Sequence, residues 1–283
     1  MEMNAYEKLV SDEDRARRYL LKNSFKNHQR ICPRCSCRKL YKLAEGRRRC
    51  SRCKYTFSEF AGRWLNRSNI TCIDWLRVVK LFELELSTRK IAKQAGLPYK
   101  TAYRAVTILR LAIMSQAEDG EILLGREVEM DESYFGGRRK GKRGRGAAGK
   151  VPVFGILERD GRAFVQVVTN VTAETLLGVA VKKVRRGSVV YTDKYRAYDS
   201  LMFCGYRHLS VDHSKRFSRG KVYINGMEGF WSWAKERIIK HHGVSPERFP
   251  LYLKELEFRY NNREDDIFPL LVSYITNLVP IVA

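Results

Sequence analysis

Four cysteines arranged in two closely spaced pairs restrict the fold of this chain more than any other feature of its sequence. Two residues separate Cys32 from Cys35, two separate Cys50 from Cys53, and fourteen lie between the pairs. Each tight turn can present two thiolates, and four thiolates at this spacing can close a tetrahedral zinc site. The sequence therefore predicts a structural Zn²⁺ held by these four residues in a zinc ribbon over residues 31–62, a module too small to fold without its metal.

The remaining cysteines stand outside this pattern. Cys37 is a competing ligand beside Cys35, whereas Cys72 and Cys204 are predicted to be ordinary core residues. Unligated, partly buried cysteines are the alternative for the two pairs. A disulfide framework is not expected, because the chain is long and its start lacks the apolar core of a signal peptide. No run of 18 or more apolar residues occurs, so we expect a cytoplasmic, nucleoid-associated protein.

The charge of the chain predicts a nucleic-acid partner. Lys and Arg number 54 against 31 Asp and Glu, a formal net charge of +23, which has the sign that attracts phosphate backbones. Seven positive charges fall in the Gly-rich residues 136–150. We interpret this segment as a clamp on DNA, with a solvated hairpin tip as the alternative. Its candidate DNA contacts are Arg138, Arg139, Lys140, Lys142, Arg143 and Arg145.

Residues 68–118 have the pattern of a helix-turn-helix. Apolar residues one turn apart predict a helix from Thr71 and a short second helix capped by Ser87 or Thr88, and Gly96 begins the turn to a third. An ordinary helical hairpin is the alternative, but the neighbouring basic ribbon favours DNA binding. The residues that the third helix would present to a major groove are Lys100, Thr101, Tyr103 and Arg104.

From residue 122 onward, short strand-like runs alternate with helical ones, which predicts a mixed α/β domain over residues 122–283. Two of the predicted strands end in Asp131 and Asp193. Carboxylates gathered at one sheet edge can hold a divalent metal ion, although a single Asp at a strand end is more often a turn former. Glu132 is a rival to its neighbour Asp131 that the strand pattern does not exclude.

A third acid, Glu228, lies on a predicted helix. Lys235 follows it by seven residues, so the two share nearly one azimuth and lie about 10 Å apart along the axis. They would present an acid suited to a metal ion and a base suited to a DNA phosphate. Glu228 also fits a capping box with Asn225 as the N-cap, and the local sequence leaves both interpretations open.

Motifs along nearly the whole chain resemble those of bacterial insertion-sequence transposases of the fifteen-ninety-five group, which are related to the Merlin elements. The motifs are CPRC and CSRC with the trailing YTFSEFAG, then TRKIAKQAGLPYKTAYR, VEMDESYFGG, VVYTDKYRAY, HLSVDHSKRF, INGMEGFWSWAK and FRYNNR. The resemblance implies an RNase H-like catalytic domain of the retroviral-integrase superfamily with an acidic triad of the DDE type. Matched residue by residue, the triad is Asp131, Asp193 and Glu228, followed by Lys235. Asn225 is a further catalytic candidate, because some members have Asn in place of the third acid.

The implied reaction is DNA transposition. Asp131 would bridge two Mg²⁺ or Mn²⁺ ions, with Asp193 and Glu228 each holding one, and the ions would stabilise charge on the attacking and leaving oxygens. A homodimer or higher oligomer would bind double-stranded DNA, nick the transposon terminal inverted repeats by hydrolysis, and join their 3′ ends to target DNA. The alternatives are a catalytically inactive DNA-binding regulator or domesticated transposase, and a metal-dependent nuclease without strand transfer.

Residues 1–30 would form an N-terminal arm that precedes the ribbon. His208 or His213 could lie near the acidic triad, but a histidine in a strand is more often packed or on the surface.

Overall fold

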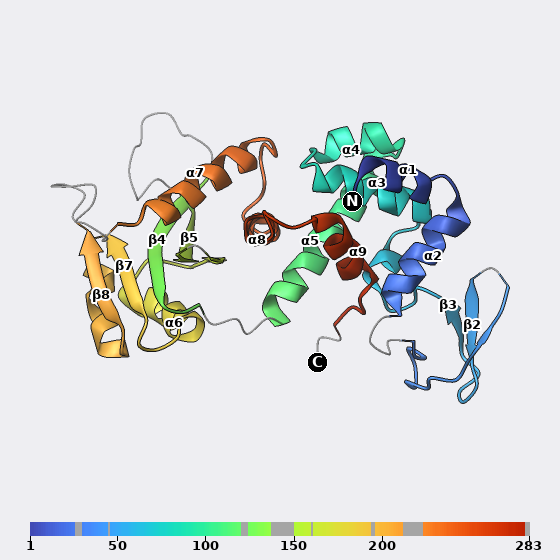
Figure 1. The fold of residues 1–283 in the computed structure, drawn as a ribbon, viewed down its shortest axis with the longest axis horizontal. Coiled ribbons are helices and arrows are strands. Elements are labelled where there is room, and N and C mark those ends of the chain that lie inside the picture. The colour runs from blue at the N-terminus through green and yellow to red at the C-terminus, as the bar shows by residue number, and fades with distance from the viewer. Residues whose placement is uncertain are drawn as a thin grey trace. The chain divides into compact units, whose positions relative to one another are not determined.

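The computed structural model describes residues 1–25, 30–44, 46–119, 124–136, 150–159, 161–193, 196–211 and 223–280. The chain forms two compact units, one from Met1–Ala117 together with Glu264–Ala283 and the other from Glu118–Arg263 (Figure 1). Within the described ranges, no helix has both the length and the apolar character that a membrane span needs.

The first unit begins with two helices, α1 (Met3–Leu9) and α2 (Glu13–Ser24), where the sequence predicted an arm. Helix α2 contacts α3 (Cys72–Glu83). The carboxylate of Glu13 accepts hydrogen bonds from the main-chain N–H groups of Cys72 and Ile73, at 2.6 and 3.0 Å. It thereby satisfies two amides that the start of α3 leaves without helical partners. Residues 1–24 are therefore part of the packed unit, which corrects the predicted arm.

The zinc-ribbon segment is a three-stranded antiparallel sheet. Its strands are β1 (Leu40–Lys42), β2 (Arg47–Cys50) and β3 (Thr56–Ser58), in the order β1-β2-β3. The second pair of cysteines lies at the turn between β2 and β3, and Phe57 packs against Cys32 and Cys50 in a very small core. Small modules with so little apolar core commonly need a bound metal to fold.

Three helices follow as predicted: α3, α4 (Thr88–Ala95) and α5 (Tyr99–Asp119). The Thr71 hydroxyl caps α3 by accepting a hydrogen bond from the N–H of Asp74 at 3.0 Å. Gly96 ends α4 with a φ of 67°, in the left-handed region that glycine adopts without strain. On α5, Lys100 and Arg104 are exposed, and Thr101 and Tyr103 are partly exposed.

Helix α9 (Ile267–Thr276) belongs to the first unit and not to the predicted α/β domain over residues 122–283. It contacts α2 and α3, and Phe268 and Leu271 on it are fully buried. The buried guanidinium of Arg63 donates to the carbonyl oxygen of Thr276 at 2.7 Å. An apolar helical pattern predicts that a helix is buried but not what it packs against, so residues 264–283 were assigned to the wrong unit.

A five-stranded sheet with the order β6-β5-β4-β7-β8 organises the second unit. The strands are β4 (Glu127–Phe135), β5 (Val151–Glu158), β6 (Ala163–Val167), β7 (Val189–Asp193) and β8 (Arg207–Val211). β5 pairs antiparallel with both β4 and β6, whereas β7 runs parallel to β4 and β8 parallel to β7. An antiparallel meander extended by two parallel strands in this order is the sheet of an RNase H-like fold.

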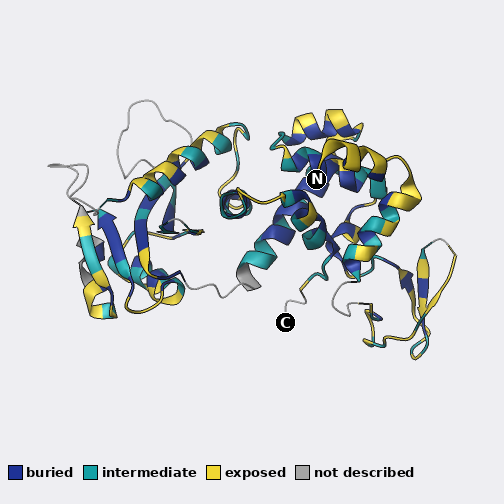
Figure 2. Ribbon diagram, in the orientation of Figure 1, coloured by how far each residue is buried: buried dark blue, intermediate teal, exposed yellow. Residues whose placement is uncertain are grey.

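Helices cover both faces of this sheet. α6 (Ala173–Lys183) and the 3-10 helix η3 (Arg196–Cys204) pack in one core with Val128 and Met130 of β4. α7 (Asn225–Ile239) and α8 (Phe249–Asn261) pack in a second core with Val153 of β5. Figure 2 shows the buried strands β4 and β7, and the exposed outer side of α7. Residues that alternate along β4 therefore face either α6 or α7.

Candidate active site and metal-binding cluster

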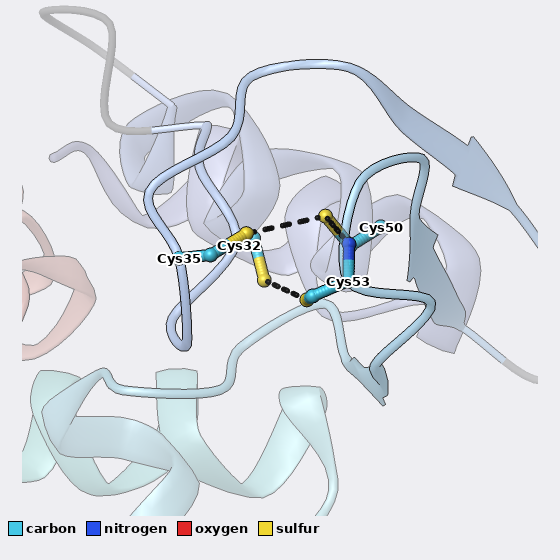
Figure 3. Close-up of side chains that lie close together, drawn as sticks. All are labelled: Cys32, Cys35, Cys50 and Cys53. Atoms are coloured by element: carbon cyan, nitrogen blue, oxygen red, sulfur yellow. Dashed lines mark hydrogen bonds between the residues drawn. The ribbon is translucent and has the colours of Figure 1, made fainter.

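The four cysteines of the ribbon converge as the sequence predicted. Their sulfur atoms all lie within 4.8 Å of one another, with 3.6 Å between Cys32 and Cys53 and 3.5 Å between Cys35 and Cys50 (Figure 3). A tetrahedral Zn²⁺ with bonds of ~2.3 Å holds its sulfur ligands about 3.8 Å apart, so this donor set matches zinc. Cys37 lies outside the cluster, with its sulfur 3.5 Å from the Ser51 hydroxyl.

The two aspartates of the predicted triad occupy neighbouring parallel strands. β4 and β7 pair from Glu127 with Val189 to Glu129 with Tyr191, and the same offset relates Asp131 to Asp193. Residues in register on parallel strands project from the same face of a sheet. Asp193 ends β7 as predicted, but Asp131 lies in the middle of β4, which continues to Phe135. The register of β4 with β7 therefore aligns the two aspartates, although only Asp193 lies at a strand end.

The strand pleat separates Asp131 from its rival, Glu132. Asp131 accepts a hydrogen bond from the indole N–H of Trp231 on α7, at 3.1 Å. Glu132 is buried and accepts a hydrogen bond from the Tyr198 hydroxyl of η3, at 2.9 Å. The two acids therefore face opposite sides of the sheet, and Asp131 faces α7.

Close contact between α7 and the sheet depends on Gly155, which pairs with Asp131 across β4 and β5. A Cβ atom on Gly155 would come within 2.3 Å of the Met227 side chain and 2.6 Å of the Trp231 ring. The absence of a side chain on Gly155 lets α7 approach the backbone beside Asp131. Sequence reasoning did not single out this glycine, because its partner helix lies about 70 residues away.

Glu228, Trp231 and Lys235 follow one another at spacings of three and four residues, which place them along one side of α7. Trp231 contacts Asp131, so this side of the helix faces β4. Partial burial lowers the pKa of Lys235, and the charge of Asp131 acts in the opposite direction. Lys235 is therefore within electrostatic reach of Asp131, while the Glu228 side chain is exposed.

The surroundings of Asp131 disfavour the negative charge of its carboxylate. Burial raises its pKa to about 7, and the neighbouring carboxylates of Glu132 and Asp193 add to the rise. Hydrogen bonds from the main chain of Glu132 and from Trp231 oppose it only in part. Carboxylates gathered with this excess of negative charge form a donor set that matches a hard divalent cation.

The capping-box interpretation of Glu228 is wrong. Helix α7 begins at Asn225, its N-cap is Ile224, and no side chain caps it from that position. The main-chain N–H of Met227 donates instead to the carboxylate of Glu129, a buried residue of β4, at 2.9 Å. Sequence reasoning missed Glu129, because it lies 98 residues before Met227, whose main-chain N–H donates the hydrogen bond.

The three acids do not form a closed cage. In the part of the chain that the structure describes, the cysteine cluster is the only group of three or more potential ligands whose ligand atoms all lie within 4.8 Å of one another. Asp131, Asp193 and Glu228 are all described, and they do not form such a group. The sheet aligns the two aspartates, and α7 places Glu228 on the side that faces β4.

Comparison with known proteins identifies the family. The ISXO2-like transposase domain matches residues 122–261, and the transposase zinc-ribbon domain matches residues 11–56. An "Uncharacterized transposase-like protein" of Haemophilus influenzae is 43% identical over 103 residues, which make up 36% of this chain and 84% of that protein. The chain belongs to the ISXO2-like transposases.

This membership confirms the resemblance to the fifteen-ninety-five group and, with the strand order, the predicted RNase H-like fold. A second relative of the transposase is an "Uncharacterized protein in transposable element ISH50" of Halobacterium salinarum, 29% identical over 231 residues, with 74% of this chain and 76% of that protein covered. Among solved structures, the Mos1 strand transfer complex is 13% identical, with a TM-score of 0.33 over 72% of this chain and 74% of that one.

The structure places one of the two candidate histidines beside β7, and several other predicted site residues lie beyond the described residues. His208, on β8, has its Nε2 2.8 Å from the hydroxyl of Thr192 on β7. His213 lies outside the described residues, as do the candidate DNA contacts Arg138, Arg139, Lys140, Lys142, Arg143 and Arg145.

Proposed function

We propose that this transposase binds the terminal inverted repeats of its element, nicks the DNA ends by metal-dependent hydrolysis, and joins the 3′ ends to target DNA. The observation that carries the proposal is the alignment of Asp131 with Asp193 on neighbouring parallel strands, beneath the helix that bears Glu228 and Lys235. Family membership supports the reaction class, and the aligned carboxylates support the chemistry.

Asp131, Asp193 and Glu228 would hold two Mg²⁺ or Mn²⁺ ions. When bound, such ions stabilise negative charge on the attacking and leaving oxygens of a phosphodiester and lower the pKa of a bound water molecule. The donor set supports this assignment, because carboxylate oxygens are the ligands that these hard cations prefer.

The chain's own side chains prepare the site in two ways. The indole N–H of Trp231 fixes one oxygen of Asp131, so that the carboxylate keeps one orientation. Lys235 lies on the same side of α7 and would hold a DNA phosphate near the scissile bond. Its positive charge would offset the negative charge of that phosphate. Asn225 begins α7, about one helical turn before Glu228, and remains the alternative to Glu228 as the third catalytic residue.

DNA would be bound outside the acidic site as well. The exposed side of α5, with Lys100, Thr101, Tyr103 and Arg104, supports major-groove contact. The basic ribbon and the basic residues 136–150 would contact the phosphate backbone. A homodimer or higher oligomer would bring two transposon ends together, since each end is a separate repeat.

The test is to incubate the purified transposase with terminal inverted-repeat DNA and Mg²⁺, scoring nicking and joining separately. Glu228→Gln should lower both rates by at least ~100-fold, while DNA affinity and melting temperature stay close to wild type. Glu236→Gln, on the same helix and 81% exposed, is the matched control and should behave as wild type.

Other outcomes of this test separate the alternatives. Full activity in Glu228→Gln with loss in Asn225→Ala would move the third catalytic position to Asn225. Nicking without joining would indicate a nuclease, and DNA binding without either reaction would indicate an inactive regulator.

A further inference from the structure

A buried ionic network joins strand β4 to the start of helix α7. Glu129 is only 1% exposed and lies two residues before Asp131, on the same face of the strand. Its carboxylate accepts hydrogen bonds from the main-chain N–H of Met227, at 2.9 Å, and from Nε of Arg159, at 3.2 Å. The residue after Met227 is Glu228, so Glu129 contacts the backbone directly beside the third acid of the proposed site.

Arg159 holds the chain just ahead of α7. Its Nη2 donates to the carbonyl oxygen of Tyr223 at 2.9 Å, and its Nη1 donates to Glu127 at 2.9 Å. The guanidinium also lies 3.6 Å from the ring centroid of Tyr191 and 4.2 Å from that of Tyr223. The entry to α7 is thus held at two points, the Tyr223 carbonyl by Arg159 and the Met227 amide by Glu129.

Gly226 allows the helix start to come this close. A Cβ atom at this position would lie 2.9 Å from the Glu129 carboxylate and 2.9 Å from the Leu157 side chain. Any larger residue would therefore push the first turn of α7 away from β4 or displace the Glu129 carboxylate. The glycine and the buried glutamate form one close-fitting contact.

A contribution to stability alone does not account for this network. Burying an ion pair costs desolvation energy that its attraction often fails to recover, and apolar residues of similar volume are frequently as stable. A buried network whose charges are all hydrogen-bonded fixes the surrounding segments in one geometry. Catalytic groups need such definition, because displacements of about 0.5 Å or 10–20° degrade a site.

We propose that Glu129 is a positioning residue of the transposase: by holding the first turn of α7 on β4, it sets the distance from Glu228 to Asp131 and so the affinity for the catalytic metal ions. This inference rests on the proposed function, because it concerns the same acids. Glu129 itself does not touch substrate or metal, and it acts through the position of Glu228.

The test measures metal binding as well as activity, using Mn²⁺ alone as the probe. Mn²⁺ is titrated into the full chain, free and bound Mn²⁺ are separated by electron paramagnetic resonance, and nicking is assayed over the same concentrations. Glu129→Gln keeps the shape of the side chain but removes the charge that faces the Met227 amide and Arg159. We expect at least a ~10-fold weaker Mn²⁺ affinity and a matching increase in the Mn²⁺ concentration for half-maximal nicking.

Glu127→Gln is the matched control. Glu127 is also on β4 and also bonded to Arg159, but its side chain is 48% exposed and its other contact is the Tyr191 hydroxyl. Its substitution should change Mn²⁺ affinity by less than ~2-fold. Equal losses in the two variants would overturn the positioning role, because they would trace the effect to Arg159 and not to the helix contact.

Gly226→Ala is the second variant and leaves every charge in place. Its Cβ would displace the first turn of α7 or the Glu129 carboxylate, so a purely structural effect would change the melting temperature and leave the Mn²⁺ affinity of the folded protein unchanged. A positioning effect predicts weaker Mn²⁺ binding in a folded protein, and this variant decides the question if Glu129→Gln fails to fold.

Wild-type Mn²⁺ affinity in both Glu129→Gln and Gly226→Ala would overturn the inference, even if nicking and joining occur as proposed. Conversely, a wild-type chain that binds Mn²⁺ but neither nicks nor joins would refute the proposed function. The Mn²⁺ affinities of the variants, compared with that of the wild type, would still test the role of Glu129.

Discussion

Replacing Asp131 by asparagine should stabilise the transposase at alkaline pH when no divalent metal is bound. Folding raises the pKa of this carboxyl from 3.8 to about 7, through burial and then the charges of Glu132 and Asp193. Because the folded-state pKa is the higher one, the contribution of Asp131 to stability is complete below pH 3.8 and is lost as the pH rises through 7. A shift of about 3 pH units, at ~1.36 kcal/mol each, corresponds to about 4 kcal/mol of unfolding free energy above pH 8.

Asparagine keeps the shape of the side chain and an oxygen for the Trp231 N–H, so the substitution removes mainly the charge. Differential scanning calorimetry at pH 8.5, after dialysis against buffer without Mg²⁺ or Mn²⁺, should show one transition moved upward by roughly 10 °C. At pH 4 the variant and the wild type should melt together. Excess Mn²⁺ should narrow the difference at pH 8.5, because only the wild type keeps its full set of metal ligands.

Glu127→Gln, an exposed charge change on the same strand, is the control and should shift the melting temperature little at either pH. If Asp131→Asn is no more stable than wild type at pH 8.5, the carboxylate is not electrostatically strained. The site would then lack the excess of negative charge that a bound divalent cation is expected to neutralise.

Three further predictions concern the first unit and DNA binding. Cys50→Ser should abolish binding of about one zinc by elemental analysis, whereas Cys37→Ser should retain it, and retention in both would exclude the four-cysteine site. Deleting residues 138–145 should flatten the salt dependence of DNA affinity, since fewer counterions are released; an unchanged slope would show that the segment does not contact DNA. Phe268→Ala should destabilise the first unit by about 3–5 kcal/mol, measured as a lower melting temperature for that unit, and a shift confined to the second unit would contradict the placement of α9.

Features set by local sequence could be predicted from the sequence. The cysteine pairs lie within 22 residues, and tight turns fix each pair, so their spacing alone predicts the cluster. The helices near Thr71 and Gly96 depend on capping and turn residues within a few positions. The two aspartates could be singled out as site candidates because strand-forming runs precede them and because the family motifs place them in order.

Features set by contacts between distant segments could not be predicted. Glu129 reads in sequence as one polar residue of an alternating strand, and only the fold brings Met227 to it. The alignment of Asp131 with Asp193 depends on the register of β4 with β7, which no local pattern specifies. The strand pattern alone does not decide between Asp131 and Glu132. The choice depends on knowing that α7 covers the face of β4 with Asp131 and that η3 covers the face with Glu132.

The position of α9 has a consequence for how the transposase folds during synthesis. The second unit, Glu118–Arg263, is one continuous stretch of chain and can complete its sheet as soon as that stretch has left the ribosome. The first unit starts earlier but finishes later, because the surface of α2 and α3 that α9 covers stays open until residue 276 has been made. A nascent chain can therefore complete the unit that contains Asp131, Asp193 and Glu228 before α9 completes the other unit.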